Sequence, residues 1–258
     1  MTLQTFQLPF DVSLLPVKRL SAGLVKCGYE NGNLRYIHLG GREVVRMIYS
    51  AVRNENWETA SYQIADEVIE EKEGGFFITY NAFYRLNEIR YKAFIEIEGK
   101  DDSISFSMKG VALTSFQSNR IGICVLHPIN TTAGKNVGIK QPDGSSYEGV
   151  FPVHISPHQP FKQVQQMQWQ IEDALEAKMT FEGDIFETED QRNWTDASYK
   201  NYSRPLDLPF PYGVQVGEEI HQKVTLNISG NKIIGDHVTS APTSAEETVI
   251  PFPKIGYS

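Results

Sequence analysis

The sequence contains very little cysteine. Among 258 residues, only Cys27 and Cys124 are cysteines. Two thiols cannot form a disulfide framework, and they cannot supply a zinc site of four thiolates. We therefore expect two buried, reduced thiols in a cytoplasmic protein.

The sequence also lacks long apolar runs and an excess of basic residues. No stretch approaches the roughly 18 consecutive apolar residues of a membrane span, and the first residues lack the positive segment of a signal peptide. The 24 Lys and Arg residues are outnumbered by 32 Asp and Glu residues, which gives a formal net charge of −8. A protein that binds nucleic-acid phosphates needs the opposite balance. We expect no secretion, no membrane partner and no nucleic-acid partner.

What the sequence does contain is repeated alternation of apolar and polar residues. It occurs in segments 103–108, 175–181 and 223–229, and SISFSM is the clearest case. A period of two is typical of a strand with one buried face. Residues that favour tight turns lie between such segments, as in ENGN at 30–33 and EGG at 73–75. These features predict short antiparallel strands joined by hairpins.

The predicted fold class is all-β, a large antiparallel β-sandwich with few or no helices. Roughly a dozen strands are expected, which suits two sheets packed face to face. Segment 57–73 fits a helix or a hairpin arm, and we favour the hairpin arm. Residues 1–229 are assigned to the sandwich domain. Residues 230–258, rich in Ser, Thr and Pro, are assigned to a tail or a linker toward a second domain.

The most unusual stretch is GDIFETEDQRNWTDASYK at 183–200, which gathers charges of both signs around one tryptophan. If the strand carrying Met179 and Phe181 continues, its inward row reaches Glu187 and Glu189, with their Cα atoms roughly 6.5 to 7 Å apart. Two such carboxylates can serve general acid/base chemistry, and we predict both as catalytic. The same stretch supplies candidates for substrate binding, namely Asp190, Arg192, Asn193, Trp194, Asp196 and Lys200.

Other interpretations of this stretch stay open. It could be a solvated turn in which Arg192 and Lys200 pair with neighbouring acids. The carboxylates of 187–190 could instead hold a divalent ion, which is a less favoured alternative. A β-bulge between Phe181 and Glu187 would exchange the side chains that face inward with those that face outward. The inward-facing polar side chains would then be Asp184, Thr188 and Asp190.

Two further segments end in residues that suit a binding site. An alternating strand in IYSAVRNENW, at 48–57, ends in Arg53, Asn54 and Trp57, which we predict to bind substrate. Aromatic faces and polar side chains of this kind line sugar sites.

The second of these segments is NRIGICVLHP at 119–128, a strongly apolar strand between Arg120 and His127. We predict Arg120 to bind substrate. His127 could be an ordinary histidine at the core edge, or a catalytic neutral imidazole that contacts a hydroxyl. The site prediction requires the segments centred on Trp57, His127 and Trp194 to converge on one hollow.

The remaining motifs do not indicate a metal or a cofactor. His154 and His158 are four residues apart, but Pro157 excludes the helix that would place them on one face. A nucleophilic serine elbow and a glycine-rich phosphate loop are both missing from the sequence. We predict no metal and no cofactor.

Taken together, these segments resemble the N-terminal β-sandwich region of the D-apionate lactonase family. The resemblance is carried by IYSAVRNENW, NRIGICVLHP, FPVHISPHQPF and above all FEGDIFETEDQRNWTDASYKNYSRPLDLPFPYG, and it spans roughly residues 40 to 220. It implies sugar-acid metabolism and hydrolysis of a branched-chain sugar lactone. The sandwich is also similar to the galactose-mutarotase superfamily, whose members bind sugars on a concave sheet lined with His, Arg and carboxylates.

Three functions follow as hypotheses. In a lactonase, Glu187 or Glu189 would activate water and His127 would polarise or protonate an oxygen. The developing oxyanion or the product carboxylate would be held by Arg53, Arg120 or Arg192. The alternatives are a non-catalytic carbohydrate-binding or domain-packing module, and an aldose 1-epimerase. The expected partners are a small sugar or sugar acid and, because family members continue beyond this region, a C-terminal barrel domain.

Overall fold

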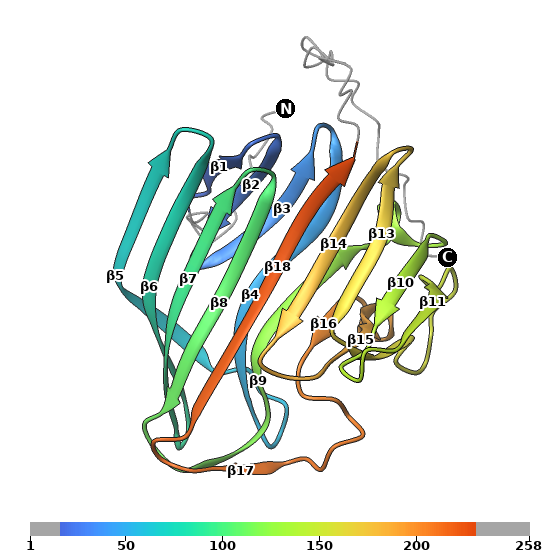
Figure 1. Ribbon diagram of the computed structural model, residues 1–258. Helices are drawn as coiled ribbons and strands as arrows, with labels where there is room; N and C mark the ends of the chain where they lie inside the picture. The colour runs from blue at the N-terminus through green and yellow to red at the C-terminus, as the bar shows by residue number, and fades with distance from the viewer. Residues whose placement is uncertain (1–15, 231–258) are drawn as a thin grey trace, which may run out of the picture.

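The computed structural model describes residues 16–230, which form two nine-stranded antiparallel sheets packed face to face (Figure 1). We name them sheet A and sheet B. This architecture confirms the prediction of a large all-β sandwich. The predicted tail lies outside the described residues from 231 onward.

Sheet A carries the first four strands, the long strand β9 and four later strands. β17 (Tyr212–Val214) pairs with its long strand β9. The other strands follow one another across the sheet in the order β1 (Lys18–Ala22), β2 (Val25–Glu30), β3 (Asn33–Leu39), β4 (Arg42–Asn54), β9 (Phe116–Pro128), β16 (Ser198–Tyr202), β15 (Phe186–Asp190) and β12 (Phe161–Val164).

Sheet B carries the long middle hairpins, and segment 57–73 contributes its edge strand rather than a helix. Its order is β11 (Ser146–Val150), β10 (Asn136–Lys140), β13 (Gln166–Glu172), β14 (Leu175–Glu182), β18 (Glu219–Gly230), β8 (Ser103–Ala112), β7 (Ile89–Lys100), β6 (Gly75–Leu86) and β5 (Ser61–Lys72).

Helical structure within residues 16–230 is limited to two single turns, α1 (Ile129–Thr132) and η1 (Gln191–Trp194). Neither has the length or the hydrophobicity that crossing a membrane requires, and the described residues contain no other helix. Strands therefore form most of the described framework, and turns and loops place the remaining side chains.

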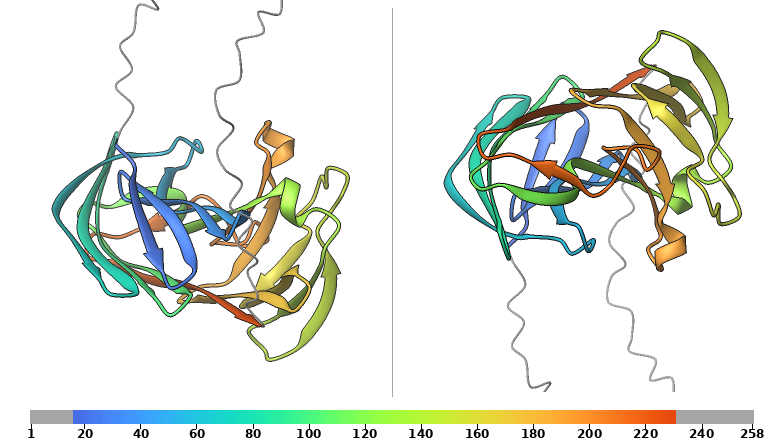
Figure 2. Two further views of the ribbon diagram at one scale, coloured as in Figure 1. Left: turned by 90° about the horizontal axis from the view of Figure 1, so that it is seen from above. Right: turned by 90° about the horizontal axis from the view of Figure 1, so that it is seen from below.

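The core lies between the two sheets, which form the layers seen end-on in Figure 2. The alternation in the sequence explains it: in β8, Ile104, Phe106 and Met108 are at most 1 % exposed, while the intervening serines are half-buried on the other face. Burying the apolar row of each strand supplies the main driving force for packing.

The chain changes sheets between β14 and β15. β14 ends at Glu182, and Gly183, with φ +89°, turns the backbone toward sheet A. The ring centroids of Phe181 and Phe186 lie 4.7 Å apart on either side of this link. The prediction that one inward row continues from Phe181 to Glu187 is therefore wrong, because the two residues belong to different sheets.

Candidate functional site

The five residues of β15 divide between the two faces of sheet A. Phe186 belongs to the core and Thr188 accepts a hydrogen bond inside it, so the even-numbered residues face sheet B. Glu187 and Glu189 share the opposite, outer face, as their spacing predicts. Their face is not the expected inward one, because the preceding turn resets the alternation.

These two glutamates lie in a group of side chains that four strands bring together. Arg120 on β9 and Lys200 on β16 contact Glu189, and a tryptophan from the turn after β4 packs on Arg120. We call this group the Arg120 cluster; it comprises Arg53, Trp57, Arg120, Glu187, Glu189, Lys200 and Tyr202.

Arg120 is the centre of the cluster and is almost fully buried. Its guanidinium carbon lies 3.3 Å from the ring centroid of Tyr202 and 4.9 Å from that of Trp57. Phe210 packs edge-on against Trp57, with centroids 5.4 Å apart. The Nε of Arg120 is buried without a hydrogen-bond partner among the described residues. A buried donor without a partner is costly, and the packing of Arg120 between two aromatic rings helps to offset that cost.

Glu189 connects the cations of the cluster to Trp194. Its Oε2 lies 3.3 Å from Nζ of Lys200 and 3.9 Å from Nη1 of Arg120. Its Oε1 accepts a hydrogen bond of 2.9 Å from the indole nitrogen of Trp194, a side chain that is 70 % exposed. Glu189 is 15 % exposed at its side chain, so the carboxylate lies at the boundary between buried charge and solvent.

Glu187 is more enclosed and serves as an anchor. Its Oε1 accepts a 2.5 Å hydrogen bond from the hydroxyl of Tyr202 and a 2.7 Å bond from the backbone nitrogen of Leu206. Burial raises the pKa of Tyr202, so its phenol stays protonated and donates. Glu187 therefore holds the ring on which Arg120 rests.

The cluster carries an excess of positive charge. Arg53 on β4 lies directly opposite Arg120 on the neighbouring strand β9. Two like charges on opposite residues of paired strands repel each other. Burial lowers the pKa of Lys200, and the positive charges of Arg53 and Arg120 lower it further. The negative charge of Glu189 raises this pKa but does not outweigh the other effects. Three cationic side chains thus face two carboxylates, an arrangement that an anionic ligand would stabilise.

Sequence reasoning did not single out two aromatic members of this environment, Tyr202 and Phe210. Tyr202 follows Lys200 by two residues in SYKNY, so the period of the strand could have placed both on one face. Phe210 comes from a loop, and the sequence contains no signal that brings it to Trp57.

Other predicted substrate-binding residues lie close by but hold the protein together. Asp190 turns away from Glu189 and forms a two-pronged ion pair with Arg192, with contacts of 2.9 and 2.7 Å. Arg192 also donates to the backbone carbonyls of Pro152, Val153 and His154. Asn193 donates to the carbonyl of Ser156. We name these three side chains, Asp190, Arg192 and Asn193, the loop clamp, because they fix segment 152–156.

Asn54 and Asp196 are likewise committed to local structure. Asn54 is buried, and its Oδ1 accepts hydrogen bonds from the backbone nitrogens of Asn56 and Glu58, which shapes the turn that presents Trp57. Asp196 accepts a hydrogen bond from the hydroxyl of Ser198. Neither side chain belongs to the Arg120 cluster, although both were predicted to bind substrate.

His127 lies on the inner side of sheet A and is fully buried. Its Nε2 donates to Oδ1 of Asn201 at 2.5 Å, and Asn201 in turn donates to Thr188. The rings of Phe151 and Trp169 pack around it. Burial lowers the pKa of His127 to about 4, so the imidazole is neutral. Trp57 and Trp194 each contact a member of the Arg120 cluster, whereas His127 does not join them, because the sheet separates it from the cluster.

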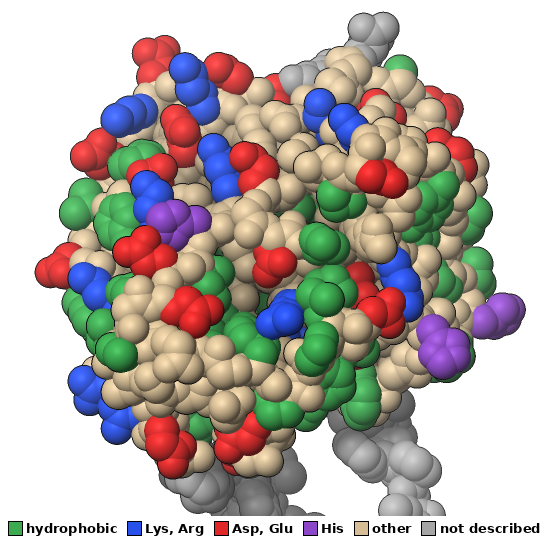
Figure 3. Space-filling view, turned by 60° about the horizontal axis from the view of Figure 1, so that its bottom comes forward, with side chains coloured by type: hydrophobic (Ala, Val, Ile, Leu, Met, Phe, Trp, Pro, Cys, Tyr) green, Lys and Arg blue, Asp and Glu red, His purple; other side chains and the backbone are tan. Residues whose placement is uncertain are grey.

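Residues 16–230 contain no group of three His, Cys, Asp or Glu side chains arranged to hold a metal ion. The ion considered for the carboxylates of 187–190 is disfavoured because Asp190 points to the other face and is paired with Arg192. On the face that Figure 3 brings forward, basic and acidic side chains are mixed with hydrophobic ones rather than gathered by sign.

Comparison with known proteins decides the family. The profile of the family described as "D-apionate lactonase, N-terminal domain" matches residues 10–231. The chain belongs to this family. A D-apionate lactonase of Brucella anthropi is 38 % identical over 215 residues, which cover 83 % of this chain and 35 % of that protein. The chain thus spans about a third of the length of this curated relative.

Solved structures share the fold at low sequence identity. A protein of Synechocystis sp. PCC 6803 has a TM-score of 0.58 at 8 % identity, over 88 % of this chain and all of that one. A candidate aldose 1-epimerase of Escherichia coli K12 has a TM-score of 0.53 at 10 % identity, over 84 % and 99 %. A GH36 α-galactosidase of Geobacillus stearothermophilus has a TM-score of 0.53 at 12 % identity, over 84 % and 41 %. These proteins share the fold of this chain, and chemistry must be argued from the site.

Proposed function

We propose that this chain acts on a sugar-acid lactone as the first domain of a lactone hydrolase, and that the Arg120 cluster binds the ligand. The observation that carries the proposal is the guanidinium of Arg120, which stacks between Tyr202 and Trp57 beside the partly exposed carboxylate of Glu189. The D-apionate lactonase of Brucella anthropi supports the substrate class.

The chemistry of lactone hydrolysis suits this arrangement of charges. Water adds to the carbonyl carbon, negative charge develops on the carbonyl oxygen, and the ring ester bond breaks to give a hydroxyl group and a carboxylate. Arg120 and Lys200 would stabilise first the oxyanion and then the product carboxylate. Trp57 and Trp194 provide exposed aromatic faces against which the carbon skeleton of a sugar can pack.

Glu189 is the better general base of the two glutamates. It has solvent access and lies beside both cations, whereas Glu187 is occupied by Tyr202 and the backbone of Leu206. Glu189 would remove a proton from the attacking water and return it to the ring oxygen. Glu187 acts as a positioning residue through Tyr202.

The surroundings of this domain are part of the proposal. We place the protein in the cytoplasm, in line with its two free, buried cysteines. We also propose that a second domain completes the enzyme, because the match with the relative covers only 35 % of that protein.

The test is a base-consumption assay of the chain with the lactone of D-apionate and related aldonolactones, alongside calorimetry with the matching aldonates. We expect aldonate binding, loss of binding in Arg120→Met, and lactone turnover that falls at least a hundredfold in Glu189→Gln. Asp207→Asn, which alters an exposed carboxylate outside the cluster, is the matched control. Wild-type binding of aldonates and lactones that is unchanged in Arg120→Met would overturn the site.

A non-catalytic module is the second candidate, and the exposure of Trp194 and Phe210 favours it. These side chains are 70 % and 46 % exposed at the edge of the cluster, where another domain could cover them. In that case the chain binds aldonates without turnover. The cluster does not support the epimerase alternative. That hypothesis requires His127 to protonate the ring oxygen of the sugar, but His127 is buried on the inner side of sheet A, away from the cluster.

A further inference from the structure

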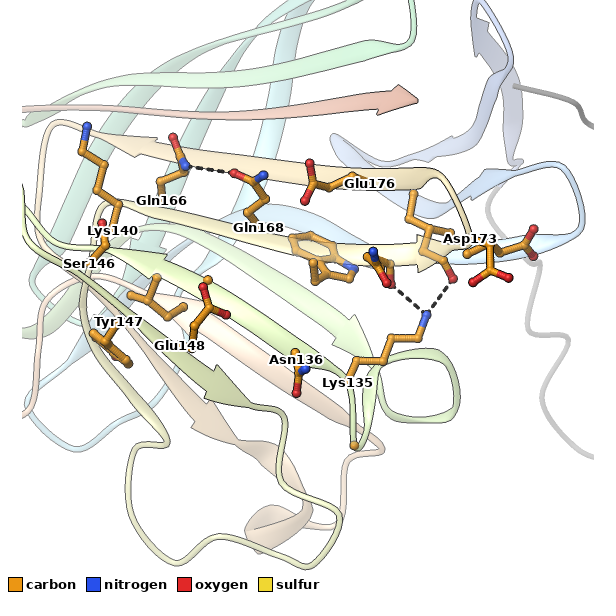
Figure 4. Close-up of a pocket in the computed structure, with 17 residues that line it drawn as sticks. Lys135, Asn136, Lys140, Ser146, Tyr147, Glu148, Gln166, Gln168, Asp173 and Glu176 are labelled. Atoms are coloured by element: carbon orange, nitrogen blue, oxygen red, sulfur yellow. Dashed lines mark hydrogen bonds between the residues drawn. The ribbon is translucent and has the colours of Figure 1, made fainter. Parts of the chain in front are cut away.

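A second feature lies on sheet B, away from the Arg120 cluster. β10, β11, β13 and β14 form a groove of about 720 Å³ at the end of the sheet. The sheet curls here (Figure 2), and the groove has β10 and β13 as its floor, with β11 on one side and β14 on the other (Figure 4). This volume lies within the range of about 300 to 1,000 Å³ that is typical of small-molecule sites.

A glycine opens the floor of this groove. Gly138 on β10 pairs with Gln168 on β13 and with Glu148 on β11, so it lies between the two walls. A Cβ atom there would come within 3.2 Å of Oε1 of Glu148. The absence of a side chain at Gly138 is what makes room beside this carboxylate.

One end of the groove is closed by a fixed lysine. Nζ of Lys135 donates to the backbone carbonyls of Gln170 and Ile171 at 3.0 and 2.7 Å, and it ties the start of β10 to the end of β13 (Figure 4). These bonds give the groove a rigid boundary. They also use two donors of the ammonium group, which reduces what Lys135 can offer to an anion.

The side chains that line the groove are polar and largely unpaired. Within residues 16–230, Lys140, Glu148 and Glu176 contact no hydrogen-bond or ion-pair partner through their side chains, although all three line the groove. Gln166 and Gln168 contact only each other, at 3.5 Å, through their side chains. Amide groups present a donor and an acceptor side by side, which matches the dual character of a hydroxyl group.

The charge of the groove selects against anions. Two basic residues line it, Lys135 and Lys140, and four acidic ones do so, namely Glu148, Glu172, Asp173 and Glu176. Trp169 lies beneath the floor with 3 % exposure and offers no open face for stacking. The groove therefore suits a ligand that is uncharged, rich in hydroxyl groups and bound by hydrogen bonds.

We infer that this groove is a second carbohydrate site, which binds a short neutral oligosaccharide and is separate from the lactone site. The inference does not rest on the proposed lactonase activity. Because the contacts are hydrogen bonds that replace those of water, each adds little net binding free energy, and we expect dissociation constants on the order of 0.1 to 10 mM.

The experiment is saturation-transfer NMR followed by calorimetry, with the chain and a panel of neutral trisaccharides: cellotriose, xylotriose, maltotriose and mannotriose. At least one should bind. Gly138→Val, which fills the floor with a residue that suits a strand, should weaken binding at least fivefold. Glu148→Ala, an exposed change on the edge strand β11, should do the same without affecting folding.

Two controls separate this site from the rest of the protein. Glu98→Gln changes an exposed carboxylate on β7 of the same sheet and should leave binding unchanged, as should Arg120→Met in the other sheet. The inference is overturned if no trisaccharide binds, or if binding persists in both Gly138→Val and Glu148→Ala. It is equally overturned if gluconate occupies the groove as well as the neutral sugars do.

Discussion

The guanidinium of Arg120 lies on the ring of Tyr202, 3.3 Å from its centroid, while the hydroxyl of that ring donates to Glu187. The tyrosine thus links a buried cation to a buried carboxylate without a direct ion pair between them. Removing the hydroxyl would leave Glu187 with only the backbone nitrogen of Leu206.

We accordingly expect Tyr202→Phe to destabilise the fold by about 1 to 3 kcal/mol, since a buried carboxylate loses a hydrogen bond. Aldonate binding should weaken as well, because Arg120 loses its positioned support. Urea unfolding and calorimetry measure the two effects. Tyr147→Phe, on the partly exposed strand β11, is the matched control and should change neither. Equal effects of both substitutions would contradict the linking role.

The buried His127 predicts how stability depends on pH. Burial lowers its pKa to about 4 in the folded protein, compared with about 6.5 when unfolded. The unfolded chain therefore binds more protons between these values, and stability is lost as the pH falls from 6.5 toward 4, by up to about 3 kcal/mol.

Urea unfolding from pH 7 to pH 4 checks this contribution. His127→Gln removes the titration and keeps an amide that can donate toward Asn201, so its stability should fall less steeply over the same range. His158→Gln, an exposed histidine, is the control and should retain the wild-type slope. A slope in His127→Gln equal to that of the wild type would show that other groups cause the loss.

The loop clamp predicts a local effect on segment 152–156. Although burial opposes it, hydrogen bonds from Arg192 and Ser156 lower the pKa of Asp190, so the carboxylate is ionised at neutral pH. Asp190→Asn would leave the Arg192 charge only partly compensated, at a cost of about 3 to 5 kcal/mol. We expect a lower Tm and faster proteolysis near His154. The surface substitution Asp207→Asn, which breaks an exposed ion pair with Lys162, should cost less than about 1 kcal/mol.

The turn at Gly183 predicts a large difference between two similar substitutions. Gly183 and Gly144 have φ angles of +89° and +87°, so alanine is strained by about 1 to 2 kcal/mol at both. At Gly183 the new Cβ would also lie 1.9 Å from the carbonyl oxygen of His221, whereas at Gly144 it would contact nothing within 4 Å. Thermal unfolding should therefore show a much larger loss for Gly183→Ala. Similar losses would mean that the link between the sheets is not tightly packed.

The sequence predicted the sandwich because each strand repeats the same period. It also placed Glu187 and Glu189 on one face, since two residues of a strand at that spacing always share a face. The sequence did not predict which face the two glutamates occupy. The short link at Gly183, which has a positive φ, takes the chain from sheet B to sheet A and shifts which residues of the next strand face inward. His127 was misplaced for a related reason: alternation within an apolar strand such as β9, buried on both faces, does not tell inside from outside.

The loop clamp and the groove were beyond prediction for another reason. The contacts of Arg192 are with backbone carbonyls some forty positions away, which leave no pattern in the sequence. The groove arises from the curl of sheet B and from one glycine on β10, and neither feature is visible before the strands are paired.

The link at 183–185 also joins the two surfaces described above. β14, on one side of it, forms a wall of the groove in sheet B, and β15, on the other, carries both glutamates of the Arg120 cluster. Only three residues separate these strands, so a displacement of the groove relative to the Arg120 cluster would have to be accommodated within this short link. An added or deleted residue in this connection would disturb both at once, and we expect its length to be the least variable dimension of the domain.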